Sequence, residues 1–362
     1  MERNKTILLG FLGPAIEQEE KILEIADGYE CWNLKKLSYE EFIESLKKKI
    51  PPVNGNVLRN YEDKEGRRDL FGLTRKQFEQ SSWGLLIPES LPDILPTTYA
   101  ETLFLINLYS PEFLYPLFSA GDMGIMRIDH QHKFSWEYTA YWHDQNQAHL
   151  FNKPEFVKFF KALLQQSGYG TWMFDRAQKW QSEDWRLFVA SRLFSNLKDY
   201  DIGKDSFEWQ RESAEMGAIL ESLFTAGDTQ KEEITYRLTK RAAVLLSATF
   251  PDIEKDIKKL YTQRSSFVHG EFFNHIAKES KTAFNNLPLP DFGLLGKQRE
   301  YVRWALTAYL YLAQVIKEKK TEYDSIESVI RLLERSIIDI GLREKMLEDA
   351  QTVFDLLPHK EK

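Results

Sequence analysis

Residues 251–270 read PDIEKDIKKLYTQRSSFVHG and give the clearest indication of the fold of the second half of the chain. Apolar side chains recur in it every three or four residues, which predicts a helix with one buried face. These side chains are Ile253, Ile257, Leu260 and Tyr261. Pro251 and Asp252 suit the first turn of such a helix, because proline fits the first helical position and an acid favours the helix start.

Arg264 and His269 fall at the far end of the same predicted helix. Five steps along an ideal helix place them about 140° apart, with a rise of ~7.5 Å between them. Gly270 is a natural residue to follow a helix, so the helix can end there and His269 can turn inward. A purely structural interpretation is that Arg264 and His269 stabilise a helix C-terminus, where positive charge is favoured.

Helical periods extend on both sides of this segment, from Asn152 to Leu357. They predict helices over 152–168, 184–200, 209–225, 230–248, 251–269, 298–319, 325–338 and 342–357. Thr229 and Glu232 form a capping box at the start of the fourth of these helices. We therefore expect an all-α domain over residues 151–357.

The first 150 residues show a different, mixed pattern. Strands are expected at 6–13, 28–34 and 132–142, and helices at 38–50 and 98–109. Ser38 and Glu41 form a capping box that opens the first of these helices. Residues 51–97 are rich in proline, glycine and charge and predict no element. The expected fold class is α+β, with a mixed α/β domain at 1–150. The boundary between the two domains is expected within about 20 residues of position 150.

Composition excludes several classes of protein. The chain has 362 residues, is 43% hydrophobic and carries a net charge of −7. A protein that coats nucleic acid with a broadly basic surface is therefore not expected. Its single cysteine, Cys31, permits no internal disulfide and is expected to be buried. Residues 6–13 suit a strand better than a signal peptide, and no apolar run reaches the length of a membrane span. We expect a cytoplasmic protein that makes no membrane contact.

Three segments in order resemble one protein family. They are the acidic helix AILESLF at 218–224, the helix EITYRLTKRAAVLL at 233–246, and Tyr261-x-x-Arg264-Ser265-x-x-Val268-His269-Gly270. Together they are similar to the HEPN superfamily, and more closely to the Apea-like HEPN group of prokaryotic defence proteins. The resemblance covers roughly residues 180–320. It implies a helical HEPN bundle whose RNases carry an Arg-x4–6-His motif near a helix end; many of them have Asn, Asp or His after the arginine, where this chain has Ser265.

The residue types of this motif suit RNA cleavage without a metal or other cofactor. The 2′-OH of RNA can attack the adjacent phosphorus if a base and an acid move the protons. Histidine does either near neutral pH, and the planar arginine fork holds phosphate oxygens. We therefore expect a metal-independent endoribonuclease with Arg264 and His269 as catalytic residues. Ser265 and Tyr261 would support them. Glu221 would either orient Arg264 or be an ordinary surface or structural carboxylate.

The same reasoning predicts partners. One chain supplies one histidine of this motif, whereas the reaction has two proton-transfer roles, so a two-fold homodimer is expected. The family resemblance implies the same dimer, an antiviral defence or toxin-like role, and a regulatory or antitoxin partner. The first 150 residues would then act as a sensor or regulator.

Local charge is compatible with RNA binding. Residues 231–264 hold eight basic and five acidic residues, a net charge of +3 within a chain of −7. Arg237, Lys240 and Arg241 share one helix face and are the RNA-binding candidates. An ordinary solvated helix face remains the alternative.

Two other functions stay open. One is a HEPN scaffold that binds RNA or a partner protein without cutting. The other is a metal-dependent hydrolase built on the region around His130 and His132, which would point to one side of a strand. That region also contains Asp129, His143, Asp144 and His149.

Overall fold

The computed structural model divides into two compact units. One comprises Met1–Ile106 and Leu114–Lys161, and the other comprises Asn107–Phe113 and Ala162–Lys362. The change of unit at 161/162 lies within the interval predicted around residue 150, whereas the short excursion at 107–113 has no signal in the sequence. The structure describes residues 5–11, 20–26, 29–49, 68–69, 73–74, 78–79, 81, 83–89, 104–110, 116–121, 124–127, 154–167, 185–197, 206–225, 233–269, 292–315 and 321–358.

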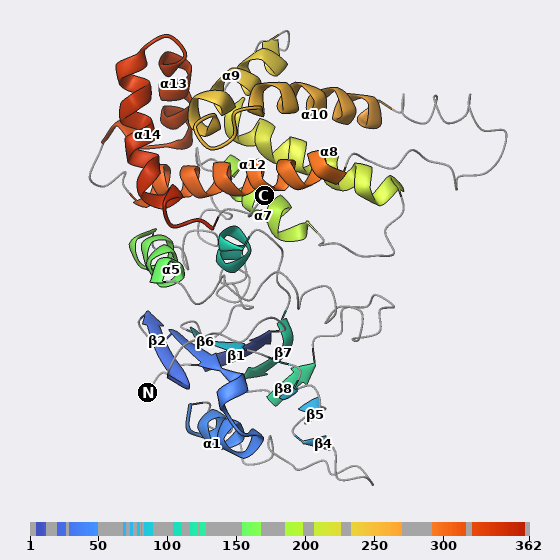
Figure 1. Ribbon diagram of the computed structural model, residues 1–362, viewed down its shortest axis with the longest axis vertical. Helices are drawn as coiled ribbons and strands as arrows, with labels where there is room; N and C mark the ends of the chain where they lie inside the picture. Colours follow the sequence, from blue (N-terminus) through green and yellow to red (C-terminus); the bar gives the residue numbers. More distant parts are fainter. Residues whose placement is uncertain are drawn as a thin grey trace, which may run out of the picture. The chain divides into compact units, whose positions relative to one another are not determined.

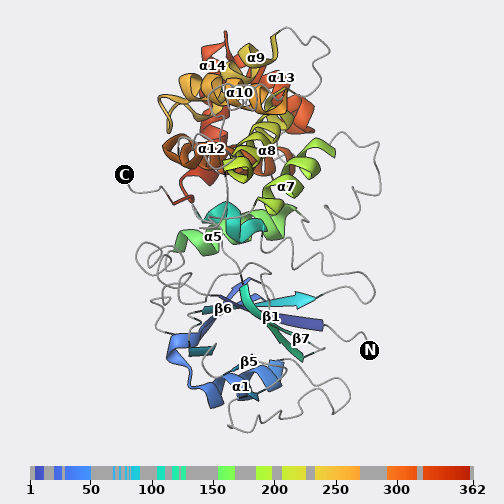
Figure 2. The same cartoon turned by 90° about the vertical axis from the view of Figure 1, so that its right-hand side faces the viewer.

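A six-stranded sheet forms the centre of the first unit (Figures 1 and 2). Its strands are β1 (Lys5–Phe11), β2 (Ile22–Ala26), β3 (Tyr29–Asn33), β6 (Trp83–Glu89), β7 (Pro116–Gly121) and β8 (Gly124–Arg127). They lie in the order β2-β3-β6-β1-β7-β8, and every neighbouring pair is antiparallel. A separate two-stranded ribbon joins β4 (Arg68–Asp69) to β5 (Leu73–Thr74).

The two faces of this sheet are covered by different helices. Side chains alternate along a strand, so Tyr29 and Trp32 of β3 point to opposite faces. Trp32 contacts Phe42 of α1 (Tyr39–Lys49), with ring centroids 6.1 Å apart. Tyr29 contacts Phe160 of α5 (Pro154–Ser167), with centroids 5.4 Å apart. The sheet is therefore buried on both faces at β3.

Local sequence signals account for the start of α1. The backbone N–H of Glu41 donates to Ser38 Oγ at 3.1 Å, and the N–H of Ser38 donates to Glu41 Oε2 at 2.9 Å. The predicted capping box and both early strands are confirmed by the structure. Cys31 is buried as expected, and burial raises the pKa of its thiol to about 12. A buried thiol that stays protonated is a poor nucleophile.

Strand β6 falls within the stretch for which the sequence predicts no element. Its residues Trp83 to Ile87 are all buried, so the strand lacks the alternation that marks a half-exposed strand. Of the predicted helix at 98–109, residues 104–109 are helical in the part that the structure describes. The predicted strand at 132–142 lies outside the described residues.

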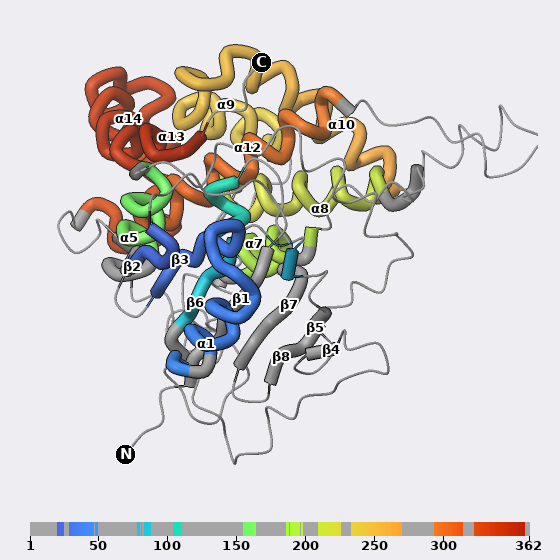
Figure 3. The backbone as a smooth tube through the Cα atoms, turned by 60° about the horizontal axis from the view of Figure 1, so that its bottom comes forward, coloured from blue at the N-terminus to red at the C-terminus, as the bar shows by residue number. Residues whose placement is uncertain are grey.

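Helices make up the described part of the second unit. They are α7 (Trp185–Asn196), α8 (Ser206–Phe224), α9 (Ile234–Leu246), α10 (Ile253–Val268), α12 (Phe292–Leu310), α13 (Ile326–Ser336) and α14 (Ile340–Phe354), with short turns η4 (Tyr311–Val315) and η5 (Thr321–Tyr323). Helix α8 packs against α7, α9, α10 and α12, and α13 packs against α9 and α14. Figure 3 shows α10 and α12 alongside α8. The α+β class predicted from the sequence is thus borne out.

Helix α12 is buried from Gln298 to Leu310 although it carries two arginines and a glutamate. Each charge has a partner. Arg299 donates to Glu212 of α8 at 2.5 and 3.0 Å, and Arg303 donates to Glu300 at 2.7 and 3.1 Å. Arg303 also donates to the carbonyl oxygens of Leu108, Tyr109 and Pro358. The bonds to Leu108 and Tyr109 connect α12 to the segment 107–113, which belongs to the same unit.

Candidate catalytic site at the end of helix α10

One face of α10 anchors the helix in the core. Ile253, Ile257 and Leu260 are at most 4% exposed, as the sequence predicts. The buried carboxylate of Asp256 accepts from Tyr301 Oη at 2.7 Å and from Lys297 Nζ at 3.0 Å, both on α12. These bonds fix the rotation of α10 about its own axis. That rotation decides which positions of α10 face the core and which face solvent.

Arg264 extends this inward-facing side toward α8. Its Nη1 donates to Glu221 Oε1, and the two side chains are only 23% and 22% exposed. Gly217 lies one turn before Glu221, and a Cβ atom built there would fall 2.6 Å from Cδ of Arg264. The arginine therefore lies against the bare backbone of α8, with its guanidinium group directed at a carboxylate.

The environment of Glu221 balances two effects. Burial raises the pKa of the Glu221 carboxyl above its ordinary value, while the charge and hydrogen bond of Arg264 offset part of that rise. Because burial penalises the charged form of Glu221, the ion pair holds Arg264 less strongly than it would without that penalty. One of the five N–H donors of the guanidinium is committed to this bond.

His269 lies at the end of the helix and is exposed. Its backbone keeps a near-helical conformation, with φ −86° and ψ 2°, and its N–H donates to Ser265 O at 3.0 Å. The side chain therefore continues the helical course onto the solvent face, and does not turn inward as the sequence interpretation allowed. Gly270 lies outside the described residues.

Arg264 and His269 thus occupy different sides of α10. Arg264 follows the direction of Ile257 and Leu260, whereas His269 follows the exposed side, in keeping with the separation of about 140° on an ideal helix. Tyr261 and Ser265 are half-buried between these two sides. The structure brings Arg264 together with Glu221 and does not bring it together with His269 of the same chain.

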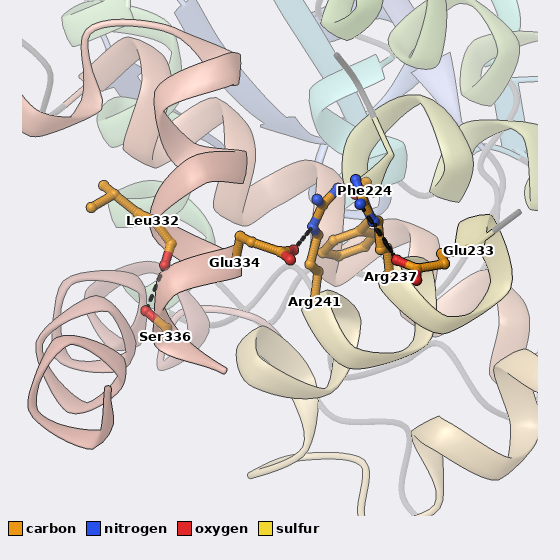
Figure 4. A network of polar contacts seen from close by, with 7 residues as sticks. All are labelled: Phe224, Glu233, Arg237, Arg241, Leu332, Glu334 and Ser336. Carbon is orange, nitrogen blue, oxygen red and sulfur yellow. Dashed lines mark hydrogen bonds and ion pairs between the residues drawn. The ribbon is translucent and has the colours of Figure 1, made fainter. Parts of the chain in front are cut away.

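The three basic residues predicted to bind RNA differ in their surroundings, and Figure 4 shows two of them, Arg237 and Arg241. Arg241 is 3% exposed, and its guanidinium donates to Glu334 Oε2 and to the carbonyl oxygen of Phe224, each at 2.6 Å. It joins α9 to α13 and satisfies a carbonyl at the C-terminus of α8, where helical carbonyls lack partners. This position is structural, and we do not carry Arg241 into an RNA surface.

Arg237 and Lys240 are nearer to solvent but are both paired with acids. Arg237 Nε lies 3.4 Å from Glu233 Oε2, and Lys240 Nζ lies 2.9 Å from Glu254 Oε2. Their positive charges are therefore largely balanced within the protein.

The metal candidates around His130 and His132, which also include Asp129, His143, Asp144 and His149, lie outside the described residues. Within the ranges that the structure does describe, no three His, Cys, Asp or Glu side chains are grouped so as to hold a metal ion. The capping residues Thr229 and Glu232 lie outside the described ranges too.

Sequence reasoning missed the role of Gly217. A glycine inside a helical pattern costs stability and usually has a packing reason, so its place in the stretch AEMGAILES at 214–222 was an available signal. The partner that needs this space, Arg264, lies 47 positions further along the chain.

Comparison with known proteins adds no relative. No family model, curated protein or solved structure matches the chain. Among the helices in the described ranges, none combines the length and the apolar character that crossing a bilayer requires.

Proposed function

We propose that this chain is a metal-independent endoribonuclease of the HEPN type. The observation that carries the proposal is the placement of Arg264, which Glu221 and Gly217 hold on α10 five residues before an exposed histidine. A restrained guanidinium group and an accessible imidazole are two kinds of group that cleavage by the 2′-OH of the RNA uses. They occur in a helical unit, as the family resemblance implies.

The proposed roles follow from the chemistry of the groups. His269 moves a proton, either from the attacking 2′-OH or to the leaving 5′-oxygen. Arg264 donates hydrogen bonds to the phosphate oxygens, where negative charge grows in the transition state. Glu221 orients Arg264, while Ser265 and Tyr261 line the end of the helix. The products are a 2′,3′-cyclic phosphate and a 5′-hydroxyl, because the nucleophile belongs to the substrate.

We propose a homodimer as the active form. Arg264 and His269 point in different directions in one chain, and the reaction has two proton-transfer roles. A two-fold arrangement of helix ends supplies a second histidine to one cleft and lets each arginine act beside the partner's imidazole. The defence or toxin-like role, and control by the N-terminal unit or by a regulatory partner, rest on the family resemblance alone.

A HEPN scaffold that binds RNA or a partner without cutting is the second candidate. It is favoured by the engagement of Arg264 with Glu221 and by the different directions of Arg264 and His269. In this case the arginine serves the packing of α8 against α10, and the histidine is a surface residue.

A cleavage assay separates the candidates. Purified full-length protein is incubated with end-labelled single-stranded RNA, with and without EDTA, beside His269→Ala. If the protein is the proposed ribonuclease, we expect it to cut the RNA equally with and without EDTA, and we expect His269→Ala not to cut it. Absence of cutting by the unaltered protein supports the scaffold, and cutting that EDTA abolishes supports the metal-dependent hydrolase based on the region of His130 and His132.

A further inference from the structure

The exposed side of α10 carries a row of polar residues, among them three lysines, that ends at His269. Its exposed members are Lys255, Lys258, Lys259, Thr262 and His269. At 100° per residue these positions fall within a sector of about 100°, centred opposite the buried residues Ile253, Ile257 and Leu260. We call this row of five residues the α10 ridge.

The charge of the α10 ridge is not cancelled by the acids of its own helix. Glu254 is paired with Lys240, and Asp256 is buried in its bonds to Tyr301 and Lys297. Asp252, at the start of the helix, is the remaining acid and is exposed. Lys255 and Lys258 are both exposed and lie within one turn of each other, so this side of the helix is locally positive on a chain whose net charge is −7.

The position of the ridge indicates which anion it suits. It ends at the exposed residue His269, and the fourteen steps from Lys255 to His269 span about 21 Å. At 3.4 Å per nucleotide of a stacked strand, that length corresponds to roughly six nucleotides. Lysine ammonium groups bind phosphates as point charges and read no sequence, which suits a surface that guides a backbone.

We propose that the α10 ridge binds the phosphate backbone of single-stranded RNA and directs it to His269. This inference rests on the proposed ribonuclease function for the end point of the track. It moves the RNA-binding surface from α9, where Arg241 is buried and Lys240 is paired, to the solvent side of α10. Lys255 and Lys258 contact phosphates several nucleotides away from the bond that is cut.

Binding to an RNA that cannot be cut tests the ridge separately from catalysis. The probe is a fluorescent 2′-O-methyl oligouridine, which lacks the attacking 2′-OH, and anisotropy is measured over a series of salt concentrations. The test protein is Lys255→Ala/Lys258→Ala. The control is Lys158→Ala/Lys161→Ala, which removes two exposed lysines from helix α5 and changes the net charge equally.

We expect the ridge variant to bind about tenfold more weakly than the unaltered protein. The slope of log affinity against log salt should flatten by ~1.4, since each lost contact to single-stranded phosphate contributes about 0.7. The control variant should keep both the affinity and the slope. All four lysines are exposed, so thermal unfolding of the variants should match that of the unaltered chain.

Each outcome decides one point. Failure of the unaltered protein to bind the probe, or equal losses in the two variants, overturns the ridge. Selective loss in the ridge variant establishes it, even if natural RNA is never cut, in which case only the ribonuclease proposal fails. If the ridge variant binds the probe normally and still cuts natural RNA, the proposed role of the ridge is wrong and the ribonuclease proposal stands.

Discussion

Arg264 crosses α8 at Gly217, where an added Cβ atom would fall 2.6 Å from Cδ of the arginine. One turn further along α8, Glu221 accepts a hydrogen bond from the same side chain. The missing side chain at 217 and the carboxylate at 221 therefore act together, since the first gives Arg264 room and the second fixes its end. The direction of a proposed catalytic group is set by a helix other than the one that carries it.

Gly217→Ala should disturb this arrangement despite the better helix propensity of alanine. Arg264 must move, because the clash involves Cδ near the middle of its side chain, and its bond to Glu221 should weaken. Gly296 of α12 is the matched control, since an added Cβ there meets nothing within 4 Å. We expect Gly296→Ala to gain about 0.5–1 kcal/mol in urea unfolding. Gly217→Ala should gain less or lose, and should cut RNA more slowly.

The Glu221 carboxyl should leave a signature in the pH dependence of stability. Its pKa is raised in the folded protein, so its stabilising contribution is present below the unfolded value and lost as pH rises through the folded value. Glu221→Gln stays neutral and keeps an acceptor for Arg264. The variant should therefore gain in stability relative to the unaltered protein as pH rises through the carboxyl range. Urea unfolding at several pH values measures this, and a relative gain as pH falls would show that Arg264 outweighs burial.

His269→Ala should slow RNA cleavage by a factor on the order of 10²–10⁴, the usual contribution of one proton-transfer group. The residue is exposed, so circular dichroism should show an unchanged fold. Arg264→Ala should slow cleavage by a comparable factor. It also removes the hydrogen-bond donor of the partly buried Glu221, so the free energy of unfolding should fall by about 1–3 kcal/mol. RNA carrying a 2′-O-methyl group should resist cutting. Full activity of a folded His269→Ala protein would rule out its catalytic role.

Arg241 and Lys240 are neighbours in sequence and should differ in unfolding experiments. Arg241→Ala removes two hydrogen bonds made by a buried guanidinium and leaves the Phe224 carbonyl without this donor, so we expect a loss of about 1.5–3 kcal/mol. Lys240→Ala breaks a solvent-exposed pair with Glu254 and should cost roughly 0.2–1 kcal/mol. Comparable losses for the two variants in urea unfolding would contradict a structural role for Arg241.

The proposed homodimer should be seen in solution. Light scattering at micromolar protein, alone and with uncleavable RNA, should give twice the mass of the chain. Mixed dimers of the unaltered chain and His269→Ala hold one histidine at the shared cleft, so they should cut RNA far more slowly than unaltered dimers. A monomer under all conditions, or mixed dimers that keep half of the activity, would speak against a shared site.

Elements that depend on neighbours along the chain could be predicted from the sequence. The capping box of Ser38 and Glu41, the strands at Lys5–Phe11 and Tyr29–Asn33, and the buried stripe of α10 are all local, because side chains within a few positions set the backbone and its apolar period. The angle between Arg264 and His269 is likewise a property of one helix. Strand β6 was not predicted because a strand covered on both faces lacks alternation.

The burial of each charged residue and the identity of its partner depend on how the helices pack, and no local pattern predicts them. Arg241 and Lys240 look alike in sequence, yet one is held by Glu334 and Phe224 and the other lies on the surface beside Glu254. Arg264 gained its orientation from Gly217 and Glu221 for the same reason. Long-range contacts depend on the rotation and packing of whole helices, and the apolar period records which face is buried without recording what that face meets.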